Sequence, residues 1–181
     1  YGESVLKSSL VSTTHAPSVW SNNNRITVKW EKPQGDPDLG EVRGYSYIWD
    51  TNTSTNPGTS IMLDANVTEL TSPPLADGQR IYFHIRVIYE NGSPYEWDDL
   101  GPFWIDATPP SKPSNVNISP GNGKLTLSWV TPSDPDFDRI AIRRLEASGS
   151  TCSYPSSPSE GTAVAEVQKG TTSYVDTNLT N

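Results

Sequence analysis

Apolar and polar residues alternate in several short runs along this chain, and turn-forming residues bound each run. The run RITVKW places Ile26, Val28 and Trp30 on one side. KLTLSW at 124–129 repeats that pattern, and IYFHIRVIY at 81–89 is the strongest run in the chain. Residues spaced by two face the same side of an extended strand. The pattern predicts short β-strands, each with one buried face.

These runs come in the same order twice. Each copy has a Pro-Ser opening, a strand that ends in Trp30 or Trp129, an Asp-Pro-Asp loop and a second alternating run, GYSYIWD or RIAIRR. The two tryptophans are roughly 100 residues apart, and a repeat of that length indicates tandem domains rather than a solenoid. In the first copy, about seven short strands with turns every 8–12 residues or so predict an antiparallel β-sandwich.

Composition narrows the class of protein further. The chain has 181 residues, with 16 prolines and 13 glycines, which punctuate it too often for long helices. There is no apolar run long enough for a membrane span. The formal charge of −8 and the absence of clustered Lys and Arg exclude nucleic acid as a partner. Cys152 is the single cysteine, so no disulfide forms within the chain.

The order of these features resembles fibronectin type III domains, in the variety common in bacterial and archaeal surface and secreted proteins. The resemblance covers effectively the whole chain and implies an all-β fold of tandem immunoglobulin-like β-sandwiches, the second one incomplete. Its motifs are specific for the fold and say little about function. The residues that carry it are Trp30, Trp129, GYSYIWD at 44–50, Leu75, Leu179 and the linker IDATPPSKPSNV at 105–116.

The resemblance implies four segments. Residues 1–12 are expected to be the G strand or tail of a preceding module, with a flexible terminus as the alternative. Residues 13–108 form a complete domain and 109–112 a linker. Residues 113–181 form an incomplete domain with strands A to E, lacking F and G. We expect either simple truncation or partial completion of this domain by the first strand of a neighbouring copy.

One feature departs from the family pattern. The family has a tyrosine six residues after the leucine of the E–F turn, where this chain has Ile81, and Tyr82 follows one position later. Either the turn carries an inserted residue, which we favour, or the tyrosine corner is absent.

Candidate catalytic groups are few. His15 lies in a linker-like stretch and His84 falls on the outward phase of its strand, so both are expected at the surface. Cys152 has no base nearby in the sequence and reads as a loop thiol. Nucleophilic catalysis needs a nucleophile, a base and an orienting acid within reach of one another. The sequence therefore indicates a protein without catalytic activity.

Acidic loops and one tryptophan are the candidate binding features. Asp36, Asp38 and Glu41 follow the first Trp-ending strand and could converge on calcium, although Asp-Pro-Asp is also ordinary turn chemistry and we favour the turn. No other cofactor is expected. Trp97 is a candidate exposed contact for a partner.

The function expected is that of a non-catalytic extracellular or cell-surface segment that serves as a spacer, scaffold or adhesion module of a larger protein. Two alternatives are an accessory region of a secreted polysaccharide-degrading enzyme and a subunit of an extracellular filament completed by strand donation. The partners expected are a protein or polysaccharide surface, or neighbouring copies of the chain. Five N-x-S/T sequons permit a secreted setting; they lie at Asn52, Asn66, Asn91, Asn117 and Asn178.

Overall fold

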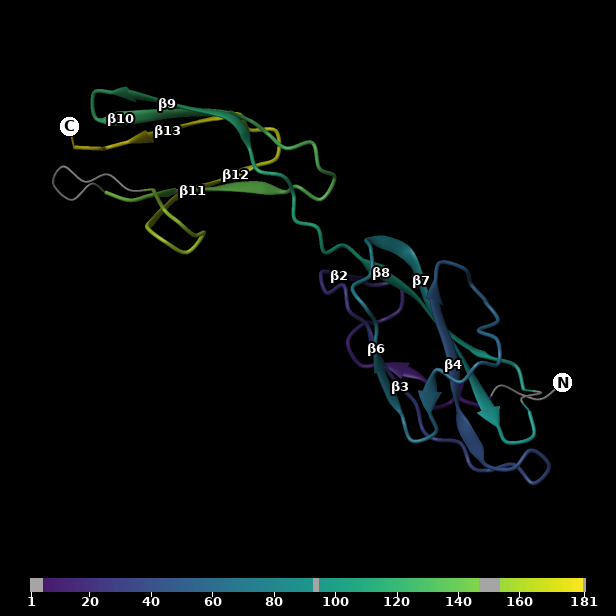
Figure 1. Ribbon diagram of the computed structural model, residues 1–181. Helices are drawn as coiled ribbons and strands as arrows, with labels where there is room; N and C mark the ends of the chain where they lie inside the picture. Colours follow the sequence, from purple (N-terminus) through teal and green to yellow (C-terminus); the bar gives the residue numbers. More distant parts are fainter. Residues whose placement is uncertain (1–4, 93–94, 147–153, 181) are drawn as a thin grey trace. The chain divides into compact units, whose positions relative to one another are not determined.

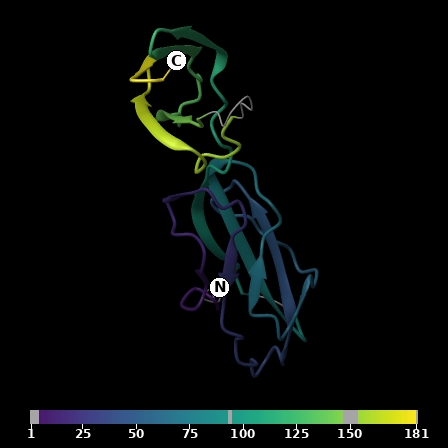
Figure 2. The same cartoon turned by 90° about the vertical axis from the view of Figure 1, so that its left-hand side faces the viewer.

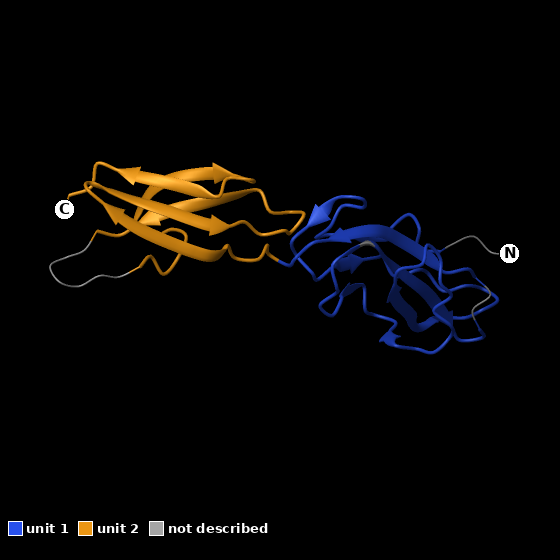
Figure 3. Cartoon of the chain, turned by 90° about the horizontal axis from the view of Figure 1, so that it is seen from above, with its two compact units in different colours: residues 1–108 blue, residues 109–181 orange. Residues whose placement is uncertain are grey.

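The chain folds as two compact units, Tyr1–Thr108 and Pro109–Asn181 (Figure 3). The structure is a computed structural model that describes residues 5–92, 95–146 and 154–180. Within these described residues, no helix has the length and apolar character needed to cross a bilayer. Each unit consists of β-strands, as the alternating runs predict.

Unit 1 is a sandwich of two sheets. One sheet has the order β1-β3-β6 and the other has the order β2-β8-β7-β4-β5. The long strands β4, β7 and β8 run side by side in Figures 1 and 2. The strands are β1 Val11–Ser12, β2 Trp20–Ser21, β3 Thr27–Lys29, β4 Val42–Asp50, β5 Leu63–Asp64, β6 Glu69–Thr71, β7 Gly78–Tyr89 and β8 Asp98–Ile105.

The core of unit 1 confirms the inward phase of the alternating runs. Ile26, Val28 and Trp30 from the first sheet are buried, and Phe83 and Ile85 from β7 are fully buried opposite them. The Phe83 ring lies 6.3 Å from the Trp30 ring between centroids. Burying one such side chain stabilises a fold by about 1.5–3 kcal/mol, so these facing residues hold the two sheets together.

The N-terminal segment belongs to unit 1, and its expected assignment to a preceding module is wrong. Leu6 is fully buried and Leu10 is 6% exposed in the core of this unit. The Leu6 amide donates to the Asp98 carboxylate at 2.9 Å, and Val11 pairs with Lys29. Residues 5–12 are therefore the first part of this sandwich. Residues 1–4 of that assignment lie outside the described residues.

Local geometry explains why the sequence pattern missed this segment. The Leu10 amide donates to the Leu6 carbonyl at 2.8 Å, so the two leucines lie on a turn that leads into β1. Apolar residues four apart on a turn do not produce the alternation that marks a strand. The chain then changes sheets, because β2 pairs in parallel with β8 and places the Trp20 ring 5.6 Å from the Trp104 ring.

Unit 2 also has two layers of strands that face each other in Figure 1. The described strands form one sheet in the order β13-β10-β9 and a second of β11 and β12. They are β9 Ser114–Gly121, β10 Lys124–Val130, β11 Arg139–Arg144, β12 Thr162–Gln168 and β13 Ser173–Thr177.

The backbone shows that the two units repeat one design. The Trp30 amide donates to the Thr68 carbonyl at 3.0 Å in unit 1. The Trp129 amide donates to the Thr172 carbonyl at 3.0 Å in unit 2. Leu75, after β6, and Leu179, after β13, also match. Their amides donate to the carbonyls of Asn24 and Gly123, which directly precede the runs that end in Trp30 and Trp129. β3 and β6 therefore correspond to β10 and β13. β4 and β11 correspond by their place in the sequence repeat, since each follows an Asp-Pro-Asp loop.

Candidate functional site

The acidic loop of unit 1 has the hydrogen bonds of a turn. Asp36 Oδ1 accepts the amides of Asp38 and Leu39 at 2.9 and 3.0 Å. The Tyr95 hydroxyl donates to Asp36 Oδ2 at 2.5 Å. That bond, followed by the Asp38 amide, holds the pKa of the Asp36 carboxyl below its usual value. Both oxygens of Asp36 are therefore engaged within the fold, as Asp residues in turns commonly are.

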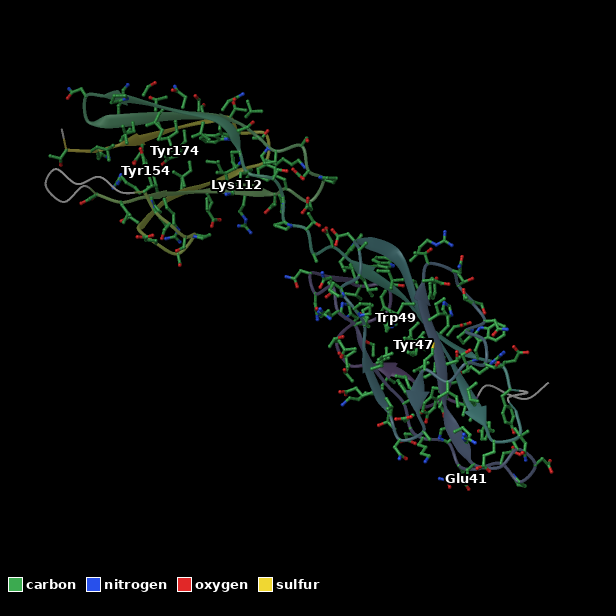
Figure 4. All side chains as sticks on the ribbon, viewed as in Figure 1. Glu41, Tyr47, Trp49, Lys112, Tyr154 and Tyr174 are labelled. Atoms are coloured by element: carbon green, nitrogen blue, oxygen red, sulfur yellow. The ribbon has the colours of Figure 1, made fainter. Side chains whose placement is uncertain are left out.

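The three candidate calcium ligands are not assembled into a metal site in this structure. Among the described residues, no group of three or more His, Cys, Asp or Glu side chains is placed to hold a metal ion. Glu41 lies at one end of unit 1 in Figure 4, and its carboxylate lies against Gly35. Calcium binding by Asp36, Asp38 and Glu41 stays the less favoured of the two predictions made for this loop.

Trp97 is part of a local cluster rather than freely exposed. Its indole Nε1 donates to the Ser54 hydroxyl at 3.0 Å. The guanidinium carbon of Arg86 lies 5.1 Å from the centre of the Trp97 ring, within the range of a cation–π contact. The side chain is half-buried. Arg86 therefore covers part of the ring, and partner binding by Trp97 stays a prediction.

Residues 51–62, which we call the outer loop, fold back over the outward face of the β4–β7 sheet. The Ser46 hydroxyl donates to the Pro57 carbonyl at 2.6 Å, and Ser46 is fully buried although it lies on the outward face. The Thr55 hydroxyl donates to the Asp50 carboxylate at 2.6 Å. The outer loop is therefore fastened to the sheet by polar contacts.

His84 lies under this loop, so its expected place at the surface is wrong. The imidazole is 0% exposed. Its Nε2 lies 3.0 Å from Asp50 Oδ1 and its Nδ1 lies 2.5 Å from Asp99 Oδ1. Carboxylates accept hydrogen bonds, so the ring bonds both of them when both nitrogens carry protons. Sequence reasoning placed His84 on the correct face of its strand but had no signal for the loop that covers that face.

The electrostatics of this cluster favour ionised Asp50. Burial alone would raise the pKa of its carboxyl, but hydrogen bonds from Thr55, Asn52 and His84 lower it to about 2. The described hydrogen-bond partners of the His84 ring are two carboxylates and the Thr55 amide, which donates to Nδ1 only when that nitrogen carries no proton. A histidine that activates a nucleophile contacts a hydroxyl or thiol. The cluster therefore has the geometry of a structural clamp.

His15 is also buried, contrary to expectation. It is 6% exposed, and its ring meets the Phe103 ring edge-on at 6.1 Å between centroids. Its Nε2 lies 2.7 Å from the Asn23 carbonyl oxygen and its Nδ1 lies 2.9 Å from the Thr14 hydroxyl. This histidine closes the connection between β1 and β2. Cys152 lies outside the described residues.

Unit 2 has an open apolar groove between its layers. Among its described residues only three hydrophobic side chains are buried, Trp129, Phe137 and Ile142. A groove of about 360 Å³ lies next to Ile142 and is lined by Leu125 and Leu127. Tyr154 also lines it, is 85% exposed and lies beside the strands of unit 2 in Figure 4.

An ion pair crosses the gap between the layers at this groove. Arg144 Nη1 on β11 lies 2.6 Å from Asp176 Oδ2 on β13, and both side chains are largely buried. The groove therefore combines apolar walls with a charge that is already paired. Sequence reasoning expected an uncovered apolar face here but not the ion pair.

The strand order defines the class of the chain. In unit 1, β1, β3 and β6 take the places of strands A, B and E of an immunoglobulin-like sandwich, and β4, β7 and β8 take those of C, F and G. Ile81 takes the inward position at the start of strand F, while Tyr82 stacks beside His84 on the outer face. Both units are built as sandwiches of the fibronectin type III kind.

No protein family profile matches the chain, and no curated protein sequence does. The chain is similar to the chicken CNTN1 FN1-FN3 domains, with 12% identity, a TM-score of 0.38, and coverage of 97% of this chain and 56% of that one. It is also similar to the central fibronectin-III array of RIM-binding protein, with 14% identity, a TM-score of 0.33, and coverage of 94% and 58%. The chain spans little more than half the length of these solved structures.

Proposed function

We propose that this chain is a non-catalytic spacer and interaction segment of a larger surface or secreted protein. The observation that carries the proposal is the way each unit fastens its end of the connection. In unit 1 the Asp106 amide donates to the Ser21 carbonyl and the Ala107 amide to the Asp77 carboxylate, both at 2.9 Å. In unit 2 the Ser111 amide and hydroxyl both donate to the Asp134 carboxylate at 3.3 Å.

The segment between these two hydrogen-bonded ends is short and stiff. Thr108 also bonds Asp77, which leaves Pro109 and Pro110. Proline fixes φ near −65° and favours the extended polyproline conformation, so consecutive prolines act as a semi-rigid spacer. A joint of this kind limits bending between the modules, which is the property that a spacer needs.

Surface chemistry supports an extracellular setting for this role. The asparagine of each of the five N-x-S/T sequons is exposed, so each is accessible to glycosylation. Because sandwich modules host many functions, the fold alone does not indicate a non-catalytic role. That role is supported by the two histidines, His15 and His84, which are both buried and hydrogen-bonded within the fold.

Electron spin resonance distance measurements test the spacer role. Spin labels placed on exposed positions of β3 in unit 1 and β10 in unit 2 should give a narrow distance distribution. Replacing Pro109 and Pro110 by glycine should broaden it, because glycine restores backbone freedom. The chain offers a matched control in Pro73 and Pro74, a second proline pair that lies inside unit 1.

The control variant, with glycine at positions 73 and 74, should leave the interdomain distribution unchanged. A distribution in the unmodified chain as broad as that of the Pro109→Gly/Pro110→Gly variant would contradict a stiff spacer. Glycosidase or esterase activity of the purified chain would contradict the non-catalytic part of the proposal.

A further inference from the structure

Unit 1 has a groove of about 600 Å³ beside the end of β4, which we call the Trp49 groove. Trp49 lines it from β4, and Leu75 lines it from the turn between β6 and β7. Ile81 lines it from β7. Sites for small molecules commonly have volumes of about 300–1,000 Å³ and combine apolar walls with a few polar groups. The Trp49 groove has the size of such a site, and all of its lining residues belong to unit 1.

The Trp49 ring gives this groove a flat apolar wall that the core holds in place. The side chain is half-buried. Its ring lies 4.6 Å from the Phe83 ring between centroids, at an angle of 41°. The face of an aromatic ring carries partial negative charge, so it attracts weakly positive C–H groups that lie flat against it. The part of the indole that remains exposed is therefore a platform for a ligand ring with C–H groups on its face.

Two carboxylates line the same groove, and the fold already uses most of their hydrogen-bonding capacity. Asp50 bonds the amide and the side chain of Asn52, the Thr55 hydroxyl and the His84 ring. Asp77 accepts the Ala107 amide and two bonds from residue 108. A carboxylate has about four acceptor sites. Asp50 is therefore filled, and Asp77 has one site left for a ligand hydroxyl.

Arg80 supplies the free donors of the groove. Its side chain is exposed and has no hydrogen bond or ion pair with the other residues that the structure describes. A guanidinium carries five N–H donors. Asp50 and Asp77 are ionised at neutral pH, so negative charge exceeds positive charge in the lining, which disfavours an anion. A cation would meet Arg80 and nearly filled carboxylates. The groove therefore suits a neutral ligand that has hydroxyl groups.

We propose that the Trp49 groove binds a neutral sugar ring of the glucose type. The equatorial hydroxyls of such a ring leave C–H groups on both flat faces, and one face stacks on the indole. Hydroxyls at the edge of the ring accept hydrogen bonds from Arg80 and donate to the free site of Asp77. The proposal rests on the interaction role proposed above and names its partner as a neutral polysaccharide.

NMR titration of the isotope-labelled chain tests this site. The probe is cellohexaose, a neutral chain of six β-1,4-linked glucose rings. In about 0.15 M salt, which screens long-range charge, it should shift the signals of the Trp49 indole and of the Ala76 and Gly78 amides in the groove. The shifts should saturate, and signals of unit 2 should stay in place. A glucosamine hexamer of the same linkage and hexagalacturonate serve as the cationic and anionic comparisons.

Two variants assign the binding to the groove. Arg80→Ala should weaken cellohexaose binding about tenfold, because donors on a charged group are lost, and its exposed position should leave folding intact. Arg43→Ala is the matched control, since Arg43 is an exposed arginine of β4 outside the lining. Trp49→Ala should abolish the shifts, whereas Trp97→Ala should retain them.

Several results would overturn the proposal. One is the absence of shifts in the unmodified chain with cellohexaose in the millimolar range, a measurement that requires no variant to fold. Shifts with either charged oligomer but not with cellohexaose would show that charge rather than stacking selects the ligand. Equal affinities of the Arg80→Ala and Arg43→Ala variants would place the sugar elsewhere. None of these results would alter the distance distribution that tests the spacer role.

Discussion

Replacement of Trp30 by alanine should remove much of the stability of unit 1. The side chain is 3% exposed and lies between the sheets, edge-on to Tyr45 at 5.3 Å and stacked with Phe83 at 6.3 Å between ring centroids. Truncation of a buried tryptophan costs about 3–5 kcal/mol, because burial is lost and a cavity remains. Domains of this size are stable by about 5–15 kcal/mol. The loss expected in Trp30→Ala is therefore a large fraction of the stability of unit 1.

A milder substitution at the same position gives a graded test. The Trp30 indole N–H is buried and has only a weak hydrogen bond, to the Tyr45 hydroxyl, so losing this donor costs little. Trp30→Phe keeps most of the ring and removes that donor. It should cost less than half of what Trp30→Ala costs.

Urea unfolding followed by resolved methyl signals of unit 1 measures these effects. With a slope of about 2 kcal/mol per molar urea, the loss in Trp30→Ala lowers the midpoint by about 2 M. Trp20→Ala is the control, because Trp20 is 50% exposed and lies at the edge of the sheet, where its ring meets that of Trp104. A loss below 1 kcal/mol in Trp30→Ala, or equal losses at the two positions, would refute the core assignment.

Three further predictions follow from the contacts above. Leu6→Ala should destabilise unit 1 by about 2–5 kcal/mol, whereas the control Lys7→Ala should change its stability little. Equal effects of the two substitutions in thermal unfolding would show that the N-terminal segment is an independent tail. Asp50 has its pKa lowered to about 2 in the fold, so its stabilising contribution is present above pH 4 or so and is lost as the pH falls toward 2. Acid titration of unfolding should show this slope, and Asp50→Asn should flatten it. Calorimetry at millimolar calcium should show no heat, because Tyr95 and two amides engage Asp36; heat with a raised melting temperature would establish the metal site.

The fold of each unit could be predicted from local patterns. Period-two alternation placed Ile26, Val28 and Trp30 on one face, and all three are buried. This works because neighbouring side chains of a strand point to opposite faces, whatever the rest of the chain does. The repeat of the Trp-ending strand about 100 residues later likewise predicted the second unit.

The candidate site could be predicted only in part. Asp36 lies in the turn that its Asp-Pro-Asp motif favours, since that chemistry involves residues close in sequence. Trp97 contacts Ser54 and Arg86, which are distant in sequence and carry no motif. The surroundings of such a side chain depend on loop paths that no local pattern encodes.

Tertiary structure alone decided what covers each strand. His84 takes the outward phase that the alternation gives it, yet it is fully buried, because the outer loop folds over that face and Asp50 and Asp99 bond its ring. Leu6 and Leu10 form no strand pattern but enter the core through a turn. Alternation determines which way a side chain points; which chain segment it meets depends on contacts between residues far apart in sequence.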